Sequence, residues 1–165
     1  MPILDDRHFE FFSHSPDQTR RLGIHLGSYL RIGDVVCLEG ILGSGKTTLV
    51  QGVAQGWGAL DPVSSPTYII VNEYRRADAE RMYHLDAYRL QKAHEVDFLD
   101  INRMLVQGPM VVEWPERIEG ALPEECLWIH LQYSGVEHRA MMFEPKGARY
   151  IKLVEKLRRK LYGDF

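Results

Sequence analysis

A glycine-rich segment of the chain carries the residue types that bind the phosphates of a nucleotide. Residues 40–47, GILGSGKT, match the phosphate-loop (P-loop) pattern GxxxxGK[ST] at every fixed position. The glycines of such a loop let the backbone curl so that successive N–H groups point at phosphate oxygens. Lys46 is expected to reach the β- and γ-phosphates, and the hydroxyl of Thr47 to ligate Mg²⁺. The pattern therefore predicts a site for a magnesium-bound nucleoside triphosphate.

Two carboxylates follow segments that are predicted to be strands, and they are candidates to complete this site. Glu113 follows Met110–Val112, and Asp86 follows Met82–Leu85. Ligands collect at the carboxyl ends of strands in open α/β sheets, and a metal–triphosphate site needs at least one acid there. We expect one acid to contact Mg²⁺ and the other to position water, and the residue pattern leaves open which does which.

Three functions are compatible with the loop. The first is an ATPase that couples ATP hydrolysis to work on another protein, and the second is a small-molecule kinase. The third is a binding module that bound nucleotide switches on or off without being hydrolysed. The sequence lacks the NKxD motif of guanine recognition, so ATP is the expected nucleotide. A kinase normally needs a lid with several arginines that excludes water. Arg75, Arg76 and Arg81 lie close together, but no long insertion that could close as a lid is present.

Helical and strand patterns alternate along the chain and supply the elements that position these residues. Ser15 and Pro16 are typical of a helix start, and this helix is expected to end at Gly33. Further helices are predicted at 46–57, 93–106 (with a break near Asp100) and 149–161, and strands at 34–39, 67–74, 81–85, 110–112, 126–133 and 138–143. This order predicts an α/β chain. We expect one P-loop ATPase domain over residues 1–165, with a P-loop NTPase-like three-layer fold around a mixed central β-sheet.

Charge and hydropathy exclude several classes of protein. The 20 Lys and Arg residues against 23 Asp and Glu give a net charge of −3, so any contact with RNA has to be local. The longest apolar runs are far shorter than the ~20 residues of a membrane span. The first residues, MPILDDRHFEFF, lack the basic start of a secretory signal. Cys37 and Cys126 form no CxxC motif and are expected to be buried thiols. These features predict a cytoplasmic protein with no membrane contact.

Four segments together resemble one known family. They are LEGILGSGKTT (38–48), SSPTY (64–68), YHLDAYRL (83–90) and VEWPERI (112–118). In this order and in so short a chain they are similar to the bacterial TsaE (YjeE) family, the small ATPase of threonylcarbamoyladenosine (t⁶A) synthesis on tRNA. One position departs from the family pattern, because Ile41 stands where the family often has an acid. That difference bears on partner contact rather than on phosphate binding.

The resemblance implies an activity, cofactors and partners. Family members bind ATP and Mg²⁺ and hydrolyse ATP weakly when alone. They act with TsaB and TsaD, the proteins that deliver the threonylcarbamoyl group to adenosine 37 of certain tRNAs. ATP turnover is implied to reset that complex between cycles, so contact with tRNA would be indirect, through the complex.

The resemblance also implies roles for particular residues. Thr47 and Glu113 would ligate magnesium, and Asp86 would be the catalytic or water-positioning acid, acting with Lys46. Trp114 would sense nucleotide or partner. The implied nucleotide-binding residues are Leu42, Gly43, Ser44, Gly45, Lys46, Thr47 and Thr48 of the loop, Thr67 in a switch-like segment, Glu116, and, flanking the base, Thr19 and the hairpin from Gly135 to Arg139.

Three further features leave alternatives open. His84 lies two residues from Asp86, hence on the same strand face, and could orient that acid or simply pack. Arg89 could neutralise triphosphate charge or form a structural ion pair. The last predicted helix carries Arg149, Lys152, Lys156, Arg158, Arg159 and Lys160 against a single Glu155. That balance indicates either a solvated face or a contact with tRNA or a partner.

Overall fold

A mixed β-sheet of seven strands forms the centre of the protein. The computed structural model describes residues 8–41, 43–63, 71–88, 90 and 99–163. The strands lie in the order β1-β7-β6-β2-β5-β4-β3. Their bounds are β1 Phe9–Ser13, β2 Val35–Glu39, β3 Val71–Arg75, β4 Arg81–Asp86, β5 Met110–Glu113, β6 Cys126–Gly135 and β7 His138–Lys146. β2 pairs in parallel with β5 and β6, and β5 with β4, whereas β1–β7, β6–β7 and β3–β4 are antiparallel.

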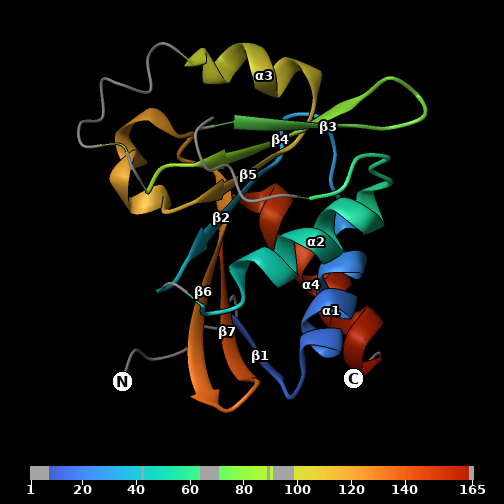
Figure 1. Cartoon of the computed structure of the whole chain (residues 1–165), viewed down its shortest axis with the longest axis vertical. Coiled ribbons are helices and arrows are strands. Elements are labelled where there is room, and N and C mark those ends of the chain that lie inside the picture. The colour runs from blue at the N-terminus through green and yellow to red at the C-terminus, as the bar shows by residue number, and fades with distance from the viewer. Residues whose placement is uncertain (1–7, 42, 64–70, 89, 91–98, 164–165) are drawn as a thin grey trace.

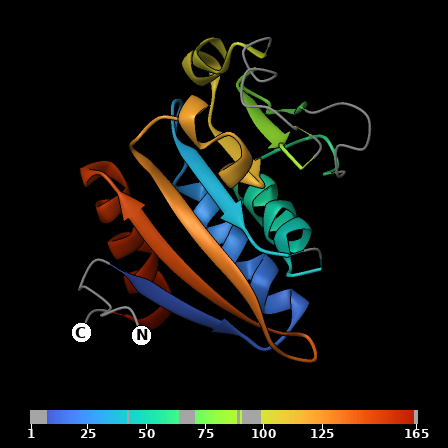
Figure 2. The ribbon, with the colours of Figure 1, turned by 90° about the vertical axis from the view of Figure 1, so that its left-hand side faces the viewer.

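Helices cover both faces of this sheet. They are α1 Pro16–Ser28, α2 Lys46–Trp57, α3 Ile101–Gln107 and α4 Ala148–Tyr162, with short 3₁₀ helices η2 Pro115–Arg117 and η3 Glu119–Ala121. Helices α1, α2 and α4 lie on one face, and α3 with the two 3₁₀ helices lies on the other (Figure 1 and Figure 2). Alternate residues of β2 point into the two cores, Val36 and Leu38 toward α1 and α2, Val35 and Cys37 toward α3. The α/β fold with a mixed sheet that the sequence predicts is confirmed.

Element boundaries differ from the sequence predictions in a few places. α1 ends at Ser28 rather than at Gly33, because the next two N–H groups bond three residues back and tighten the chain into a turn. α3 begins after Asp100, whose side chain accepts a hydrogen bond from the N–H of Arg103, and residues 93–98 lie outside the described ranges. Residues 9–13 carry no predicted element, yet β1 extends the sheet beside β7. No helix in the described ranges is long and apolar enough to cross a membrane.

The packing of α1 on α2 requires glycine at the contact. A Cβ added to Gly27 would lie 2.0 Å from the carbonyl oxygen of Val53, and one added to Gly56 would lie 1.9 Å from that of Ile24. Gly23 and Gly52 face the backbone of the opposite helix in the same manner. Backbone atoms cannot move aside as the end of a flexible side chain can. α1 therefore holds α2, and the loop at its start, in a fixed position.

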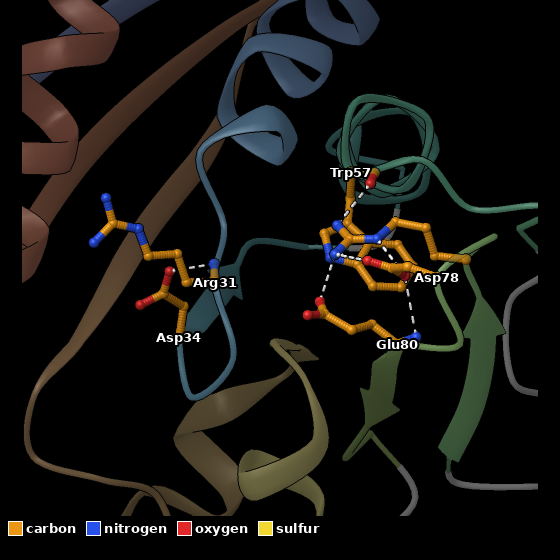
Figure 3. A network of polar contacts seen from close by, with 6 residues as sticks. Arg31, Asp34, Trp57, Asp78 and Glu80 are labelled. Atoms are coloured by element: carbon orange, nitrogen blue, oxygen red, sulfur yellow. Dashed lines mark hydrogen bonds and ion pairs between the residues drawn. The ribbon is translucent and has the colours of Figure 1, made fainter.

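The C-terminal end of α2 is held by Arg76. Its Nη1 donates to the carbonyl oxygen of Trp57 at 3.1 Å, and its guanidinium lies over the Trp57 ring, 4.5 Å from the centroid. Asp78 and Glu80 accept hydrogen bonds from the same guanidinium. Figure 3 shows Trp57, Asp78 and Glu80 gathered at this point. The C-terminal end of α2 is thus fixed by side-chain contacts, whereas its N-terminal end continues directly from the phosphate loop.

Tyr150 anchors α4 to the start of β2. Its hydroxyl accepts a hydrogen bond from the N–H of Val35 at 2.9 Å, and the side chain is buried. Burial raises the pKa of Tyr150 to about 12, although the hydrogen bond from Val35 opposes the shift. The folded protein therefore favours the neutral phenol more strongly than the unfolded chain does.

This raised pKa predicts a loss of stability at alkaline pH. The pKa of Tyr150 is close to its ordinary value of 10.0 in the unfolded chain and about 12 in the folded chain. The neutral phenol therefore contributes its full share of the folding free energy below pH 10, and this contribution is lost as the pH rises from 10 to 12. By about pH 11 the loss is about 1.4 kcal/mol, equivalent to one pKa unit. Urea denaturation at increasing pH should show the wild type losing stability faster than Tyr150→Phe, which has no ionisable hydroxyl. A constant difference between the two proteins would contradict this account.

Candidate functional site

The phosphate loop joins the end of β2 to the start of α2. Gly43 (φ 78) and Gly45 (φ 103) adopt left-handed backbone conformations that other residues avoid. The N–H of Ser44 donates to the carbonyl oxygen of Ile41 at 3.1 Å. The Ser44 hydroxyl is buried and has no hydrogen-bond partner within the described residues. An orphaned hydroxyl beside the N-terminus of a helix fits an anion held by this loop.

Lys46 folds its side chain back over the loop. Its Nζ donates to the carbonyl oxygen of Gly40 at 2.6 Å and lies 3.8 Å from the centroid of the Trp114 ring. The side chain is buried. Burial lowers the pKa of Lys46, and the negative charges of Glu113 and Asp86 oppose that shift. The ammonium group is thus placed between the loop and the two acids.

Glu113 and Asp86 lie side by side at the carboxyl ends of β5 and β4. They are partners in the parallel register of these strands, and Glu113 is also paired with Leu38 near the end of β2. All three strands end at the edge of the sheet from which the phosphate loop departs. The structure therefore brings together the two carboxylates that the sequence singles out, and it sets them beside Lys46.

The carboxyl group of Asp86 has a raised pKa. Burial raises the pKa of its carboxyl group, the N–H of Tyr88 opposes that shift, and the charge of Glu113 adds to it. Tyr88 donates this hydrogen bond to Oδ1 of Asp86 at 2.9 Å. A carboxylate whose pKa is raised toward the working pH is a stronger proton acceptor than an exposed one.

A buried chain of hydrogen bonds holds Glu113. Nε2 of His84 lies 2.7 Å from Oε2 of Glu113, and Nδ1 of His84 lies 2.8 Å from the hydroxyl of Tyr74. His84 is 0% exposed. The β4–β5 register sets His84 opposite Val111, two residues before Glu113 and on the same strand face. His84 therefore packs in the core, as one of the two alternatives expects, but the carboxylate that it contacts is Glu113 and not Asp86.

A pocket of about 320 Å³ lies among these residues. Its lining consists of Gly43, Gly45, Lys46, Thr47, Thr48, Asp86, Glu113, Trp114 and Arg139. The phosphate loop, the first turn of α2, the two acids, a tryptophan and an arginine of β7 all meet there. This size falls at the lower end of the range typical of small-molecule sites.

Trp114 follows Glu113 with a strained backbone. Its φ of 58° lies in the left-handed region, which a bulky residue adopts only when the surrounding structure enforces it. The ring is 4.9 Å from that of Tyr88, centroid to centroid, and it lies beneath the ammonium group of Lys46. The strained turn therefore directs an aromatic face at the loop lysine. Because Lys46 lies on this ring, the fluorescence of Trp114 can report a movement of Lys46.

Arg139 brings the β6–β7 hairpin to the loop. Its Nη2 donates to the carbonyl oxygen of Gly43 at 3.3 Å, and its guanidinium lies 4.3 Å from the centroid of the Tyr133 ring. Nε of Arg139 is buried without a partner in the described part of the chain. Tyr133 and Arg139 face each other in the β6–β7 register, and the sequence pattern does not identify Tyr133. Alternation predicts the hairpin, but the register decides which of its residues reach the loop.

Other residues implied by the family resemblance lie elsewhere. Thr19 is buried and donates its hydroxyl hydrogen to Oγ of Ser13 at 2.7 Å, so it does not line the pocket. Gly135 lies in an irregular turn of the hairpin and does not line it either. Glu116 is exposed in η2 and does not line the pocket, although its charge slightly opposes the lowering of the Lys46 pKa. The predicted positions that fall outside the described residues are Leu42, Thr67 and Arg89.

The donor set of the pocket fits magnesium bound together with a nucleotide. Among the described residues, no group of three or more His, Cys, Asp or Glu side chains could hold a metal ion by itself. Mg²⁺ in nucleotide sites keeps several waters and takes only one or two carboxylates besides phosphate oxygens. Thr47 and Glu113 both line the pocket and supply a hydroxyl and a carboxylate. They would hold such an ion only together with phosphate.

The fold and the loop together define the class of the protein, and comparison with known proteins gives its family. A mixed sheet with a strand–GxxxxGKT–helix segment is an α/β protein of the phosphate-loop class. The family model described as threonylcarbamoyl adenosine biosynthesis protein TsaE matches residues 13–141, and the chain belongs to this TsaE family. The resemblance that the motifs predict is therefore confirmed.

Individual relatives agree with this assignment. The tRNA threonylcarbamoyladenosine biosynthesis protein TsaE of Bacillus subtilis (strain 168) is 38% identical over 145 residues, covering 88% of this chain and 90% of that protein. The protein of the same name from Nostoc sp. is 40% identical over 118 residues, covering 68% and 72%. The crystal structure of Bacillus subtilis YdiB superposes with a TM-score of 0.77 at 32% identity, covering 93% of this chain and 95% of YdiB.

Replacing His84 by Ala is expected to destabilise the protein, because it leaves the buried carboxylate of Glu113 without its imidazole partner. The cost of such an unsatisfied group is about 1–3 kcal/mol, and urea denaturation measures it. The control is a double-mutant cycle with Glu113→Ala, in which the two costs should be strongly non-additive. Additive costs would show that His84 packs independently of Glu113.

Proposed function

We propose that this protein binds Mg·ATP, hydrolyses ATP weakly when alone, and supports t⁶A modification of adenosine 37 in tRNA by acting on a TsaB–TsaD complex. The observation that carries the proposal is the meeting of Lys46, Asp86 and Glu113 around one pocket at the start of α2. Membership of the TsaE family supports the pathway, since its relatives are named for t⁶A biosynthesis.

Each residue of the pocket has a distinct part in this activity. Backbone N–H groups of the loop and the ammonium group of Lys46 bind the phosphates. Thr47 and Glu113 would hold Mg²⁺, which neutralises phosphate charge and orients the terminal phosphoryl group. His84 keeps the Glu113 carboxylate in place. Asp86 orients the attacking water and accepts its proton, a role that its raised pKa supports.

A second cation contributes from the other side of the loop. The guanidinium of Arg139 contacts Gly43, whereas both acids approach from β4 and β5. A triphosphate lying along the loop would therefore have positive charge at both Lys46 and Arg139. Charge that develops on phosphoryl oxygens during hydrolysis is stabilised by groups placed in this way.

Within the described part of the chain, the three arginines that could serve a kinase lid are already engaged in ion pairs. Arg75 is paired with Asp61, and Arg81 is paired with Glu73. Arg76 is paired with two carboxylates beside Trp57. None of the three arginines lines the pocket. Their charges are taken up by structural ion pairs, so ATP hydrolysis, with water as the acceptor, is the function that these contacts favour.

A reconstituted assay with TsaB, TsaD, tRNA and ATP tests the proposal. Lys46→Ala and Thr47→Ala are each expected to abolish ATP-dependent t⁶A formation while leaving the circular dichroism spectrum unchanged. Loss of Lys46 removes a charge-assisted contact with phosphate, which contributes about 1.5–3 kcal/mol. Near-normal t⁶A formation by the Lys46 variant would overturn the phosphate-loop mechanism. Nucleotide binding with no phosphate release, even with partners, would favour the gated binding module.

Substitutions of the two acids should affect different quantities, ATP binding for Glu113 and turnover for Asp86. Glu113→Ala is expected to weaken Mg²⁺-dependent ATP binding, with partial rescue at high Mg²⁺. Asp86→Asn keeps the shape of the side chain but loses its basicity, so it should bind Mg·ATP nearly normally and lose turnover, since an interaction used only in the transition state lowers kcat alone. Calorimetric titration measures binding, and phosphate release with partners measures turnover. The reverse pattern would exchange the two roles, and no change in either quantity would place the site elsewhere.

A further inference from the structure

A second surface of the protein concentrates positive charge far from the phosphate loop. Along α4, Arg149, Lys152 and Lys156 follow one another at spacings of three and four residues, which places them on one side of the helix. Lys152 and Lys156 are exposed. Tyr150, which is buried, fixes the other side of α4 against the sheet. The row of cations is thus held on a rigid element.

These cations border a hollow of about 490 Å³. Tyr29 and Arg31, from the connection between α1 and β2, form its other wall. Every charged residue of the lining is a cation, and no exposed large apolar side chain is part of it. The ammonium group of Lys156 lies 4.4 Å from the centroid of the Tyr29 ring. We call Arg31, Arg149, Lys152 and Lys156 the basic surface.

The buried acid Asp34 at this surface already has hydrogen-bond partners. Asp34 is buried, and both of its oxygens accept hydrogen bonds from Arg149, at 3.2 and 2.7 Å. One of them also accepts the backbone N–H of Arg31 at 2.7 Å. Figure 3 shows this contact, with the guanidinium of Arg31 extending away from Asp34. Asp34 therefore positions the two arginines and neutralises Arg149, while Arg31 keeps its charge on the surface.

Three cations remain without a balancing carboxylate. Across the described ranges, no acid forms an ion pair with Arg31, Lys152 or Lys156. Lys152 and Lys156 are about 6 Å apart along the helix axis, at a rise of about 1.5 Å per residue. The chain as a whole has a net charge of −3, so this surface opposes the overall charge. A local excess of that kind on one face is the electrostatic footprint of a polyanion site.

We propose that the basic surface binds RNA through its phosphates. A row of lysines and arginines beside an aromatic ring suits a chain of phosphates, because the cations pair with successive phosphates and the ring can stack on a base. The basic surface lies next to the N-terminal end of β2, and the phosphate loop follows its C-terminal end. RNA and nucleotide would therefore bind at opposite ends of this strand. The inference does not require that the protein hydrolyse ATP.

Fluorescence anisotropy with an unmodified tRNA transcript and the full chain tests this inference. The double charge reversal Lys152→Glu/Lys156→Glu should weaken binding about tenfold or more and reduce the slope of log K against log salt by about 1.4–1.8, as expected for two lost phosphate contacts. The matched control is Arg103→Glu/Arg158→Glu, which makes the same change in net charge at exposed residues outside the basic surface. This control should bind like the wild type.

Three results would overturn the inference. They are failure of the wild type to bind the transcript at low salt, equal losses in the two double variants, and unchanged tRNA binding by the Lys152/Lys156 variant. If that variant keeps tRNA binding but no longer co-purifies with TsaB and TsaD, the surface serves a protein partner instead. Nucleotide titration and thermal unfolding of each variant confirm that the fold and the phosphate loop are intact. An inactive phosphate loop with normal tRNA binding would contradict the proposed ATPase while leaving this inference standing.

Discussion

The parallel pairing of β2 with β5, and of β5 with β4, is the constraint on which the candidate site depends. Because parallel strands run in the same direction, the ends of all three lie at one edge of the sheet. Lys46, Glu113 and Asp86 come from distant parts of the chain, and only this pairing sets them around one pocket. A shift of β5 by one residue would turn Glu113 to the opposite face and break its contact with His84.

The features that local sequence predicts are those that depend on neighbouring residues. The phosphate loop, the strands before both acids and the amphipathic last helix follow from spacing and residue type, and the structure contains all of them. Contacts that depend on strand register are not encoded locally. The bond between His84 and Glu113 and the approach of Arg139 to Gly43 each join segments that only the assembled sheet brings together.

The residues to which the family resemblance assigns roles lie in different surroundings. Trp114 lines the pocket, whereas Thr19 lies outside it and uses its hydroxyl in a hydrogen bond inside the fold. Thr19 bonds to Ser13 because α1 begins soon after β1, and this short connection brings the buried Thr19 side chain against the end of the strand. A motif of a few residues can indicate a shared function. Whether a given side chain is buried or accessible depends instead on how the neighbouring elements pack around it.

The glycine contacts between α1 and α2 have a mechanical consequence. With backbone against backbone there is no layer of side chains to slide or repack, so the two helices move as one body. Any displacement of the phosphate loop that shifts α2 must also carry α1, and with it Thr19 and its bond to Ser13. Ser13 is the register partner of Arg139, which itself touches the loop. The loop therefore belongs to a closed ring of contacts that runs through both helices and through β1 and β7, so a displacement at any point of this ring is transmitted to the glycines of the loop.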